Sequence, residues 1–329
     1  MMAAAAATLS AAVRQLASAD FSALAARFTE AGFAVSQPAH GIITLASPDL
    51  AARPAVLVSV GVHGDETGPI EVLAQVLDRL APSSLAVNLM VCVGNIDAIA
   101  AGQRFIDADL NRMFRAERGA LAQAAEAARA DTMIAATRAF FSNAGPQRWH
   151  LDLHTAIRPS VYPTFAVVPE LIAEQPKAQL VHWLGQAGIG AIIMNPQSAG
   201  TYSYYTAEHH GAAASTVELG RVGALGENDL SLFADVDAAL DGLLRGLPPA
   251  AAVTPHVFKV AQEIIKRSDA FTMAFGRDTQ NFTALDAGAV IASDGEMVWT
   301  VGEQPERVVF PNPDVRVGLR AGLMVVRIA

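Results

Sequence analysis

The sequence predicts an α/β fold, in which helices flank a mostly parallel, mixed sheet over residues 1–250 and a smaller β-rich domain follows over residues 251–329. Short β-branched apolar runs alternate with helix-periodic segments through the first 250 residues. That order is typical of strands buried on both faces of a parallel sheet. At Pro248-Pro249 the composition changes, and short strand-like runs separated by turns such as 293–295 follow. We place the domain boundary there.

Composition limits the classes of partner. The chain has 329 residues, of which 52% are hydrophobic, so it can bury a large core. Only 17% are charged, which argues against an intrinsically disordered protein. Its net charge of −9 argues against nucleic acid and anionic membranes as partners. An anionic substrate would therefore need a local cluster of arginines.

Three features of the sequence bear on the cellular compartment. The alanine-rich start, residues 1–13, lacks the basic leader of a signal peptide, and we expect a surface helix there. No apolar run reaches the roughly 18 residues that a membrane-spanning helix needs. Cys92 is the single cysteine and lies in an apolar run, so it predicts a core residue. Without a disulfide within the chain, a reducing cytoplasm is the expected location.

The elements follow from hydrophobic periodicity. The first 50 residues predict one or two helices and a strand pair at 33–45; a strand at 55–62, a helix with Pro69 in its first turn and a strand at 85–93 come next. Residues 95–114 are expected to form a polar loop and residues 115–141 a helix. The remaining periodic segments predict helices at 180–184 and 229–247, and strands at 149–153, 165–168, 191–194, 212–217, 257–265, 271–275, 290–291, 297–301, 308–310 and 323–328.

The stretch 63–66, His-Gly-Asp-Glu, lies between the strand at 55–62 and the helix that follows. Side chains at such strand ends face the ligand edge of an open α/β sheet. His63 and Glu66 can point at one ion, and zinc accepts imidazole and carboxylate, with three protein ligands and one water in catalytic sites. By itself the motif is weak, because Asp65 and Glu66 would also suit an ordinary helix start.

His154, at the end of the strand at 149–153, supplies a third candidate ligand, 88 residues after Glu66. With His63 and Glu66 it makes a set for one Zn²⁺ per chain. His150 is the competitor. Four residues along a strand separate it from His154 by roughly 13 Å, so both cannot bind the same ion. Asp152, between them, is a candidate to orient a ligand histidine.

Four further residues carry candidate roles. Glu218 ends the strand at 212–217 and suits a carboxylate that takes a proton from water and passes it to a leaving nitrogen. Arg104 is the candidate to stabilise an oxyanion, and Arg112, with Asn111 beside it, offers a planar fork to a substrate carboxylate. Taken singly, each arginine is better interpreted as a surface residue, and Glu218 as a loop acid remains an alternative.

Two polar clusters stay open. Tyr202, Tyr204 and Tyr205 are three of four tyrosines and lie in an expected loop, where they either pack or line a pocket. Residues 208–210 (Glu-His-His) either line the pocket or form an exposed loop, and the loop is the expectation. The other histidines show no partner pattern.

At this point the chain resembles the succinylglutamate desuccinylase family, in the aspartoacylase-like branch of the zinc carboxypeptidase fold. The likeness covers nearly the whole chain beyond about residue 30. The stretches that carry it are Gly61-Val62-His63-Gly64-Asp65-Glu66-Thr67, Arg104-Phe105, Asp109-Leu110-Asn111-Arg112-Met113-Phe114, His150-Leu151-Asp152-Leu153-His154-Thr155-Ala156, Thr216-Val217-Glu218-Leu219-Gly220, Phe310-Pro311-Asn312-Pro313 and Gly318-Leu319-Arg320-Ala321-Gly322.

The resemblance implies zinc held by His63, Glu66 and His154, with Glu218 as base and acid. Arg104, Asn111 and Arg112 would hold the substrate. Asp65 departs from the asparagine common in the family, outside the ligand set. The implied reaction converts N-succinyl-L-glutamate to succinate and L-glutamate, the last step of arginine catabolism by the succinyl route. This substrate carries three carboxylates, which suits several cations in an acidic protein.

Three alternatives remain at this stage. A related deacylase would act on another N-acyl amino acid, such as acetylaspartate, and zinc chemistry does not separate the two. A carboxypeptidase would trim peptides, which a β-rich domain closing over the active site should exclude. A metal-binding protein without catalysis would lack a base, so Glu218 argues against it. The sequence leaves the oligomeric state open.

Overall fold

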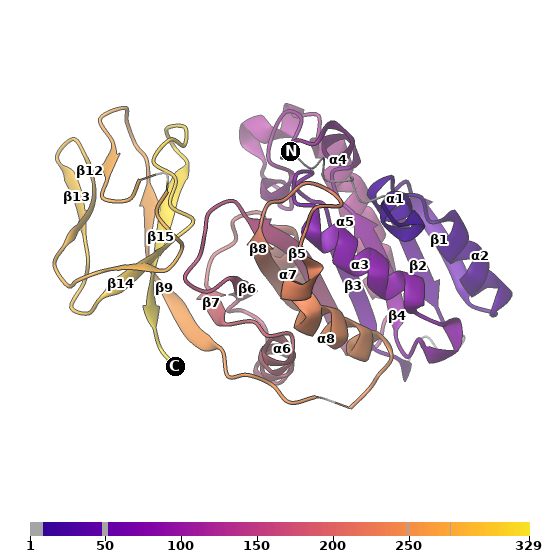
Figure 1. The fold of residues 1–329 in the computed structure, drawn as a ribbon. Coiled ribbons are helices and arrows are strands. Elements are labelled where there is room, and N and C mark those ends of the chain that lie inside the picture. Colours follow the sequence, from indigo (N-terminus) through magenta and orange to yellow (C-terminus); the bar gives the residue numbers. More distant parts are fainter. Residues whose placement is uncertain (1–8, 48–51, 249, 277) are drawn as a thin grey trace, which may run out of the picture.

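The computed structural model describes residues 9–47, 52–248, 250–276 and 278–329. One twelve-stranded mixed sheet forms its frame, in the order β1-β2-β4-β3-β5-β8-β6-β7-β9-β15-β14-β11. Helices flank the sheet, and a β-rich part lies at the C-terminal end (Figure 1). The expected fold class is confirmed.

The middle of the sheet is parallel. It comprises β4 (Asn88–Val93), β3 (Ala55–Val60), β5 (Arg148–Ala156) and β8 (Ala213–Arg221), which pair in parallel in this order. All residues of β3 and β4 are buried, as their β-branched runs predict. Because these strands run in the same direction, their carboxyl ends lie at one edge of the sheet. The candidate site residues lie at or just after these carboxyl ends.

The sheet continues on both sides. On one side, β2 (Ile42–Ala46) and β1 (Ala34–Ala39) form the expected antiparallel pair. On the other, β6 (Thr164–Pro169) runs antiparallel to β8, and β7 (Ala191–Asn195) and β9 (His256–Ile265) follow in parallel. The antiparallel strands β15 (Arg320–Arg327), β14 (Glu306–Val309) and β11 (Thr283–Leu285) complete the sheet.

The helices pack in two groups. In the first, α3 (Gly68–Arg79) contacts α1 (Ala11–Ala17) and α8 (Ala234–Leu244), and α8 contacts α6 (Glu174–Gln186). In the second, α5 (Ala127–Ser142) contacts α7 (Tyr202–His210). The remaining helical segments are short: α2 (Ser22–Glu30), α4 (Ile96–Ala101), η2 (Pro82–Ser84), η3 (Leu110–Arg112), η4 (Gly119–Gln123) and η5 (Leu230–Phe233). No helix in the described ranges is long and apolar enough to cross a membrane.

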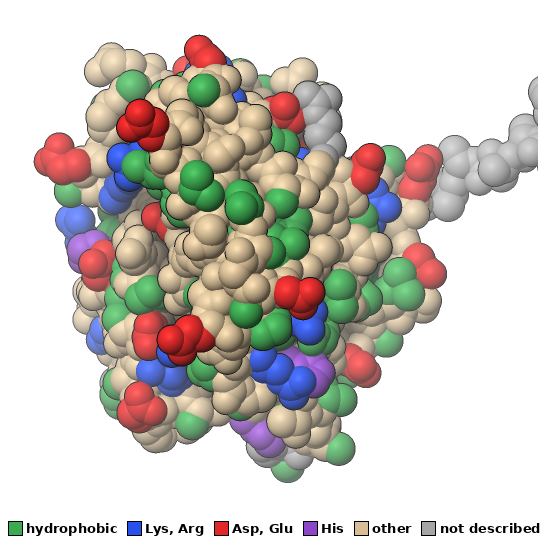
Figure 2. Space-filling view, turned by 90° about the vertical axis from the view of Figure 1, so that its left-hand side faces the viewer, with side chains coloured by type: hydrophobic (Ala, Val, Ile, Leu, Met, Phe, Trp, Pro, Cys, Tyr) green, Lys and Arg blue, Asp and Glu red, His purple; other side chains and the backbone are tan. Residues whose placement is uncertain are grey.

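The C-terminal part adds a second, three-stranded sheet, made of β10 (Thr272–Met273), β12 (Val290–Asp294) and β13 (Met297–Thr300). Phe271, Phe275 and Ile291 belong to the apolar cluster between this sheet and β15. Seen from the side of this C-terminal part, apolar side chains gather near the middle of the face and acidic and basic ones are scattered around them (Figure 2).

Two expectations about local structure need correction, and a third lies partly outside the described residues. Residues 95–114 begin with α4, whose first turn is capped by the Asn95 side chain, rather than with a loop. The helix expected over 115–141 is divided: the short segment η4 comes first, the backbone is extended at Ala124, and only α5 is regular helix. The helix expected at the start of the chain lies partly outside the described residues, as does Pro249.

Candidate active site

A tight turn after β3 places the first two candidate ligands. His63 and Glu66 lie between β3 and α3, whose first turn contains Pro69. The turn presses against α4: a Cβ on Gly64 would lie 2.2 Å from the carbonyl carbon of Ala98, and the Gly64 amide donates to the Arg104 carbonyl at 3.0 Å. A glycine is therefore required for this close approach.

His63, Glu66 and His154 converge, and all three are buried. Glu66 Oε1 lies 2.8 Å from His63 Nδ1, and Glu66 Oε2 lies 2.8 Å from His154 Nδ1. One potential ligand atom from each residue lies within 4.8 Å of the other two. Of the three, His154 comes from another strand, β5, as its sequence position predicts.

The outer nitrogen of each imidazole faces a carboxylate. His63 Nε2 lies 2.9 Å from Asp109 Oδ1, and His154 Nε2 lies 3.0 Å from Asp152 Oδ2. With both Nε2 atoms held this way, both Nδ1 atoms turn toward Glu66. A carboxylate behind each ligand imidazole is the usual environment of a protein-bound zinc ion, so this donor set fits zinc.

Asp109 was not given a role from the sequence, although it lies in the stretch 109–114 singled out above. Burial opposes its charge, but Arg112 and His63 outweigh that effect and hold the pKa of Asp109 well below its usual value. The sequence feature that could have identified Asp109 is its position two residues before Asn111. Its contact with His63 depends on long-range folding.

His150 stays out of the cluster. Its Nε2 lies 2.8 Å from Ser59 Oγ and its Nδ1 lies 2.8 Å from Thr206 Oγ1. Burial lowers the pKa of His150 to about 4, so the imidazole is neutral at physiological pH. Ser59 also donates to Asp152 at 2.5 Å, which connects His150 to the carboxylate behind His154.

Glu218 lies beside His154 on the sheet, because the two residues are paired in the β5–β8 register. It is buried, and its Oε2 has no hydrogen-bond partner among the described residues. Burial and the negative charge of Glu66 raise the pKa of Glu218 to about 7. A carboxyl group of this kind can take and return a proton near neutral pH.

Arg104 reaches the same cluster from the segment after α4. Its Nη1 lies 2.7 Å from Glu66 Oε1, and its Nη2 lies 3.1 Å from His63 Nε2. Burial lowers the pKa of Arg104, but the carboxylates of Glu66 and Asp109 outweigh it and raise that pKa overall. A permanent positive charge therefore adjoins the His–Glu–His cluster.

Asn111 and Arg112 are also close by, in η3. Arg112 Nη2 lies 3.7 Å from Asp109 Oδ2, and its side chain remains 38% exposed. The Asn111 oxygen instead accepts from the Tyr202 amide at 2.9 Å, which holds the start of α7. Of these two residues, Arg112 has the side chain that is more accessible to a ligand.

The three tyrosines pack rather than line an open pocket, and they lie on a helix instead of the expected loop. The side chain of Thr201 caps α7 at the Tyr204 amide. Tyr202 is fully buried, stacks on Phe114 at 4.4 Å between ring centres and bonds Thr137 Oγ1 at 2.5 Å. Residues 208–210 form the end of α7; two of them, Glu208 and His209, are exposed.

An open α/β sheet with a His–Glu–His cluster at its carboxyl edge, beside a buried carboxyl group whose Oε2 has no hydrogen-bond partner in the described part of the chain, defines the class: a hydrolase. Comparison with known proteins gives the family. The model of the succinylglutamate desuccinylase/aspartoacylase catalytic domain matches residues 52–244, and that of the AstE/AspA barrel-sandwich hybrid domain matches residues 253–328. The chain belongs to the succinylglutamate desuccinylase/aspartoacylase family.

Individual relatives agree. A succinylglutamate desuccinylase of Burkholderia orbicola (strain MC0-3) is 46% identical over 286 residues, which cover 85% of this chain and 83% of the relative. The structure of succinylglutamate desuccinylase from Vibrio cholerae superposes with a TM-score of 0.84 at 34% identity, covering 91% and 88% of the two chains. That from Chromobacterium violaceum gives 0.77 at 36% identity, covering 91% and 92%. These relatives indicate a hydrolase that acts on an amide.

Proposed function

We propose that the chain is a zinc-dependent amidohydrolase that cleaves N-succinyl-L-glutamate into succinate and L-glutamate. In that role it catalyses the last step of arginine catabolism by the succinyl route, in the cytoplasm. The relatives named above support the substrate. The observation that carries the chemistry is the convergence of His63, Glu66 and His154 next to Glu218, whose buried Oε2 has no hydrogen-bond partner among the residues described.

In this proposal His63, Glu66 and His154 would hold one zinc ion. When bound, zinc supplies Lewis-acid chemistry, which acidifies water and polarises a carbonyl oxygen. Asp109 and Asp152 keep the two imidazoles in the required tautomer through their Nε2 atoms.

Glu218 moves the proton. It removes a proton from the attacking water, whose oxygen bonds to the amide carbon of the succinyl group. It then delivers that proton to the glutamate nitrogen as the C–N bond breaks, so that succinate and free glutamate result. Arg104 stabilises the negative charge that develops on the carbonyl oxygen.

Arg112 binds a carboxylate of the substrate through its planar guanidinium, with Asn111 beside it. Its partial exposure leaves donors available to an incoming ligand. We place the catalytic domain at residues 1–250 and a C-terminal domain, residues 251–329, closing over the active site. Such closure suits a small substrate and excludes long peptides.

A hydrolysis panel tests the proposal. N-succinylglutamate, N-succinylarginine, N-acetylaspartate and a C-terminal dipeptide are each incubated with the zinc-loaded enzyme, with and without chelator. We expect chelator-sensitive release of succinate and glutamate from N-succinylglutamate, well above the other three. Preference for N-acetylaspartate would favour the alternative aspartoacylase-like activity, which the family also includes. Trimming of the dipeptide would favour a carboxypeptidase.

A further inference from the structure

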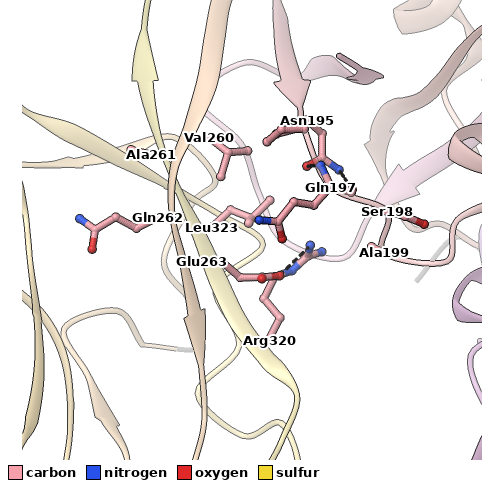
Figure 3. Close-up of a pocket in the computed structure, with 11 residues that line it drawn as sticks. Asn195, Gln197, Ser198, Ala199, Val260, Ala261, Gln262, Glu263, Arg320 and Leu323 are labelled. Atoms are coloured by element: carbon pink, nitrogen blue, oxygen red, sulfur yellow. Dashed lines mark hydrogen bonds and ion pairs between the residues drawn. The ribbon is translucent and has the colours of Figure 1, made fainter. Parts of the chain in front are cut away.

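A polar cavity lies between the catalytic sheet and the C-terminal strands. It has a volume of about 190 Å³. One wall is the end of β7 and the segment after it, residues 195–199; the other is formed by β9 and β15 (Figure 3). Since one water takes up about 30 Å³ of liquid, the cavity can hold a short carboxylate-bearing chain.

Arg320, the first residue of β15, supplies the cation of this cavity. Its side chain is 22% exposed, and its Nη1 lies 3.7 Å from Glu263 Oε1. That separation is too long for a hydrogen bond, and within the described ranges the Arg320 guanidinium donates none. In Figure 3 the Arg320 guanidinium and the Glu263 carboxylate lie together beside the Gln197 side chain.

The cavity adjoins the candidate substrate site. Gly200, directly after the cavity wall, is pressed against Arg112: a Cβ on Gly200 would lie 2.5 Å from the Arg112 carbonyl oxygen. The Phe114 amide also donates to the Gly200 carbonyl at 3.0 Å. Arg112 in turn faces Asp109, which contacts His63. The wall of the cavity is thus continuous with the segment that reaches the His–Glu–His cluster.

Charge in this region is unbalanced. Burial and the positive charge of Arg112 lower the pKa of Arg320 to about 10, although Glu263 and Asp109 partly compensate. The Arg112 and Arg320 guanidinium groups therefore repel each other, and among the described residues each forms one ion pair, at 3.7 Å. An anion between them would relieve the repulsion and gain charge-assisted hydrogen bonds.

We propose that Arg320 binds a substrate carboxylate remote from the scissile amide, so that the C-terminal domain contributes a specificity residue to the active site. This inference rests on the proposed function. Arg112 and Arg320 then face two of the three carboxylates of N-succinylglutamate, while Arg104 adjoins the His–Glu–His cluster. The remote carboxylate belongs either to the succinyl group or to the glutamate side chain, and the experiment separates these sources.

The test measures kcat and KM for Arg320→Gln and the parent enzyme on three substrates. These are N-succinylglutamate, N-succinylglutamine, and the analogue whose succinyl carboxylate is replaced by a primary amide. Hydrogen bonds to charged groups predict a KM increase of roughly 10- to 100-fold for Arg320→Gln on N-succinylglutamate, with kcat little changed. The KM ratio should fall to about one for the analogue that lacks the carboxylate bound by Arg320.

Two variants serve as controls. Arg327→Gln removes an exposed guanidinium from the other end of β15 and should leave KM unchanged, whereas Arg320→Lys should restore part of the affinity. Equal KM values for the parent and Arg320→Gln, or the same KM increase on all three substrates, would overturn the inference. In both cases an active parent enzyme leaves the proposed function standing. A parent enzyme inactive on N-succinylglutamate would overturn both.

Discussion

Glu66 and Glu218 are both buried, yet they face different charges. Burial raises the pKa of both carboxyl groups, but the imidazoles of His63 and His154 outweigh it at Glu66 and hold that pKa well below its usual value. At Glu218 burial acts together with the charge of Glu66, and the pKa rises to about 7. Environment thus assigns the two glutamates different tasks: one stays an anion, and the other can exchange a proton.

Replacing Glu218 tests that assignment. Glu218→Ala should keep stoichiometric zinc, because the three candidate ligands are untouched, but should lose hydrolysis by about 100-fold or more, as expected when a general base is removed. Metal analysis and kcat measure the two effects. Glu208→Ala, an exposed acid at the end of α7, is the control and should behave as the parent does. Normal turnover in Glu218→Ala would remove Glu218 from the mechanism.

His150 predicts a pH dependence of stability. Burial holds its folded-state pKa at about 4, below the ordinary histidine value of 6.5, and the neighbouring groups that influence this pKa are Asp152, His154 and His210. Because the unfolded chain binds the proton more readily, the stability contributed by neutral His150 is complete above about pH 6.5. It is lost as the pH falls toward 4, and can amount to ~3 kcal/mol.

Urea unfolding at several pH values measures this effect. His150→Gln should lose less stability between pH 7 and pH 4 than the parent protein, whatever its stability at neutral pH. His182→Gln, which alters an exposed histidine on α6, should keep the parental slope. Identical slopes for the parent and His150→Gln would contradict the burial argument.

At the scale of elements, the site depends on how closely the turn after β3 approaches α4. The side chains of His63 and Glu66 are aimed by a backbone that passes within contact of Ala98, and only glycine at position 64 allows this. On the other flank, Glu126 accepts hydrogen bonds from the amides of residues 106, 107 and 108, which hold the segment carrying Asp109. The cluster is therefore positioned by packed backbone as well as by its own contacts.

Gly64→Ala tests the approach of the turn. The added methyl group must displace either the turn or α4, so we expect at least a 10-fold loss of zinc affinity and of kcat/KM together, since misplaced ligands impair both. Zinc titration and kinetics give the two values. Gly242→Ala, in α8 with open space around its Cβ, should be neutral or stabilising by about 0.5–1 kcal/mol. An unchanged zinc affinity in Gly64→Ala would show that the turn tolerates the shift.

At the scale of the molecule, the candidate ligands connect distant parts of the chain, with His63 and Glu66 after β3 and His154 at the end of β5. An ion bound by all three would bind the folded state only, and would therefore stabilise the whole catalytic domain by mass action.

Metal removal should lower the melting temperature. A free zinc concentration of 100 times Kd corresponds to about 2.7 kcal/mol of stabilisation, so chelator should reduce Tm and added zinc should restore it. Differential scanning calorimetry measures the shift. His154→Ala should show no zinc-dependent shift, while His209→Ala, an exposed histidine of α7, should retain it in full. A zinc-dependent shift that survives in His154→Ala would exclude His154 from the metal site.

The sequence by itself determined the fold class, most of the strands and the residues that meet at the sheet edge. Hydrophobic periodicity indicates which segments are strands and helices. Polar side chains at the carboxyl ends of parallel strands lie at the same edge of the sheet, so the convergence of His63, Glu66 and His154 could be expected. The tertiary structure decided the rest: that Asp109 lies behind His63, that the tyrosines pack on a helix, that β9 extends the central sheet and that Arg320 lies beside Glu263 in the cavity. These relations depend on strand order and on contacts between segments far apart in the chain, which local periodicity does not encode.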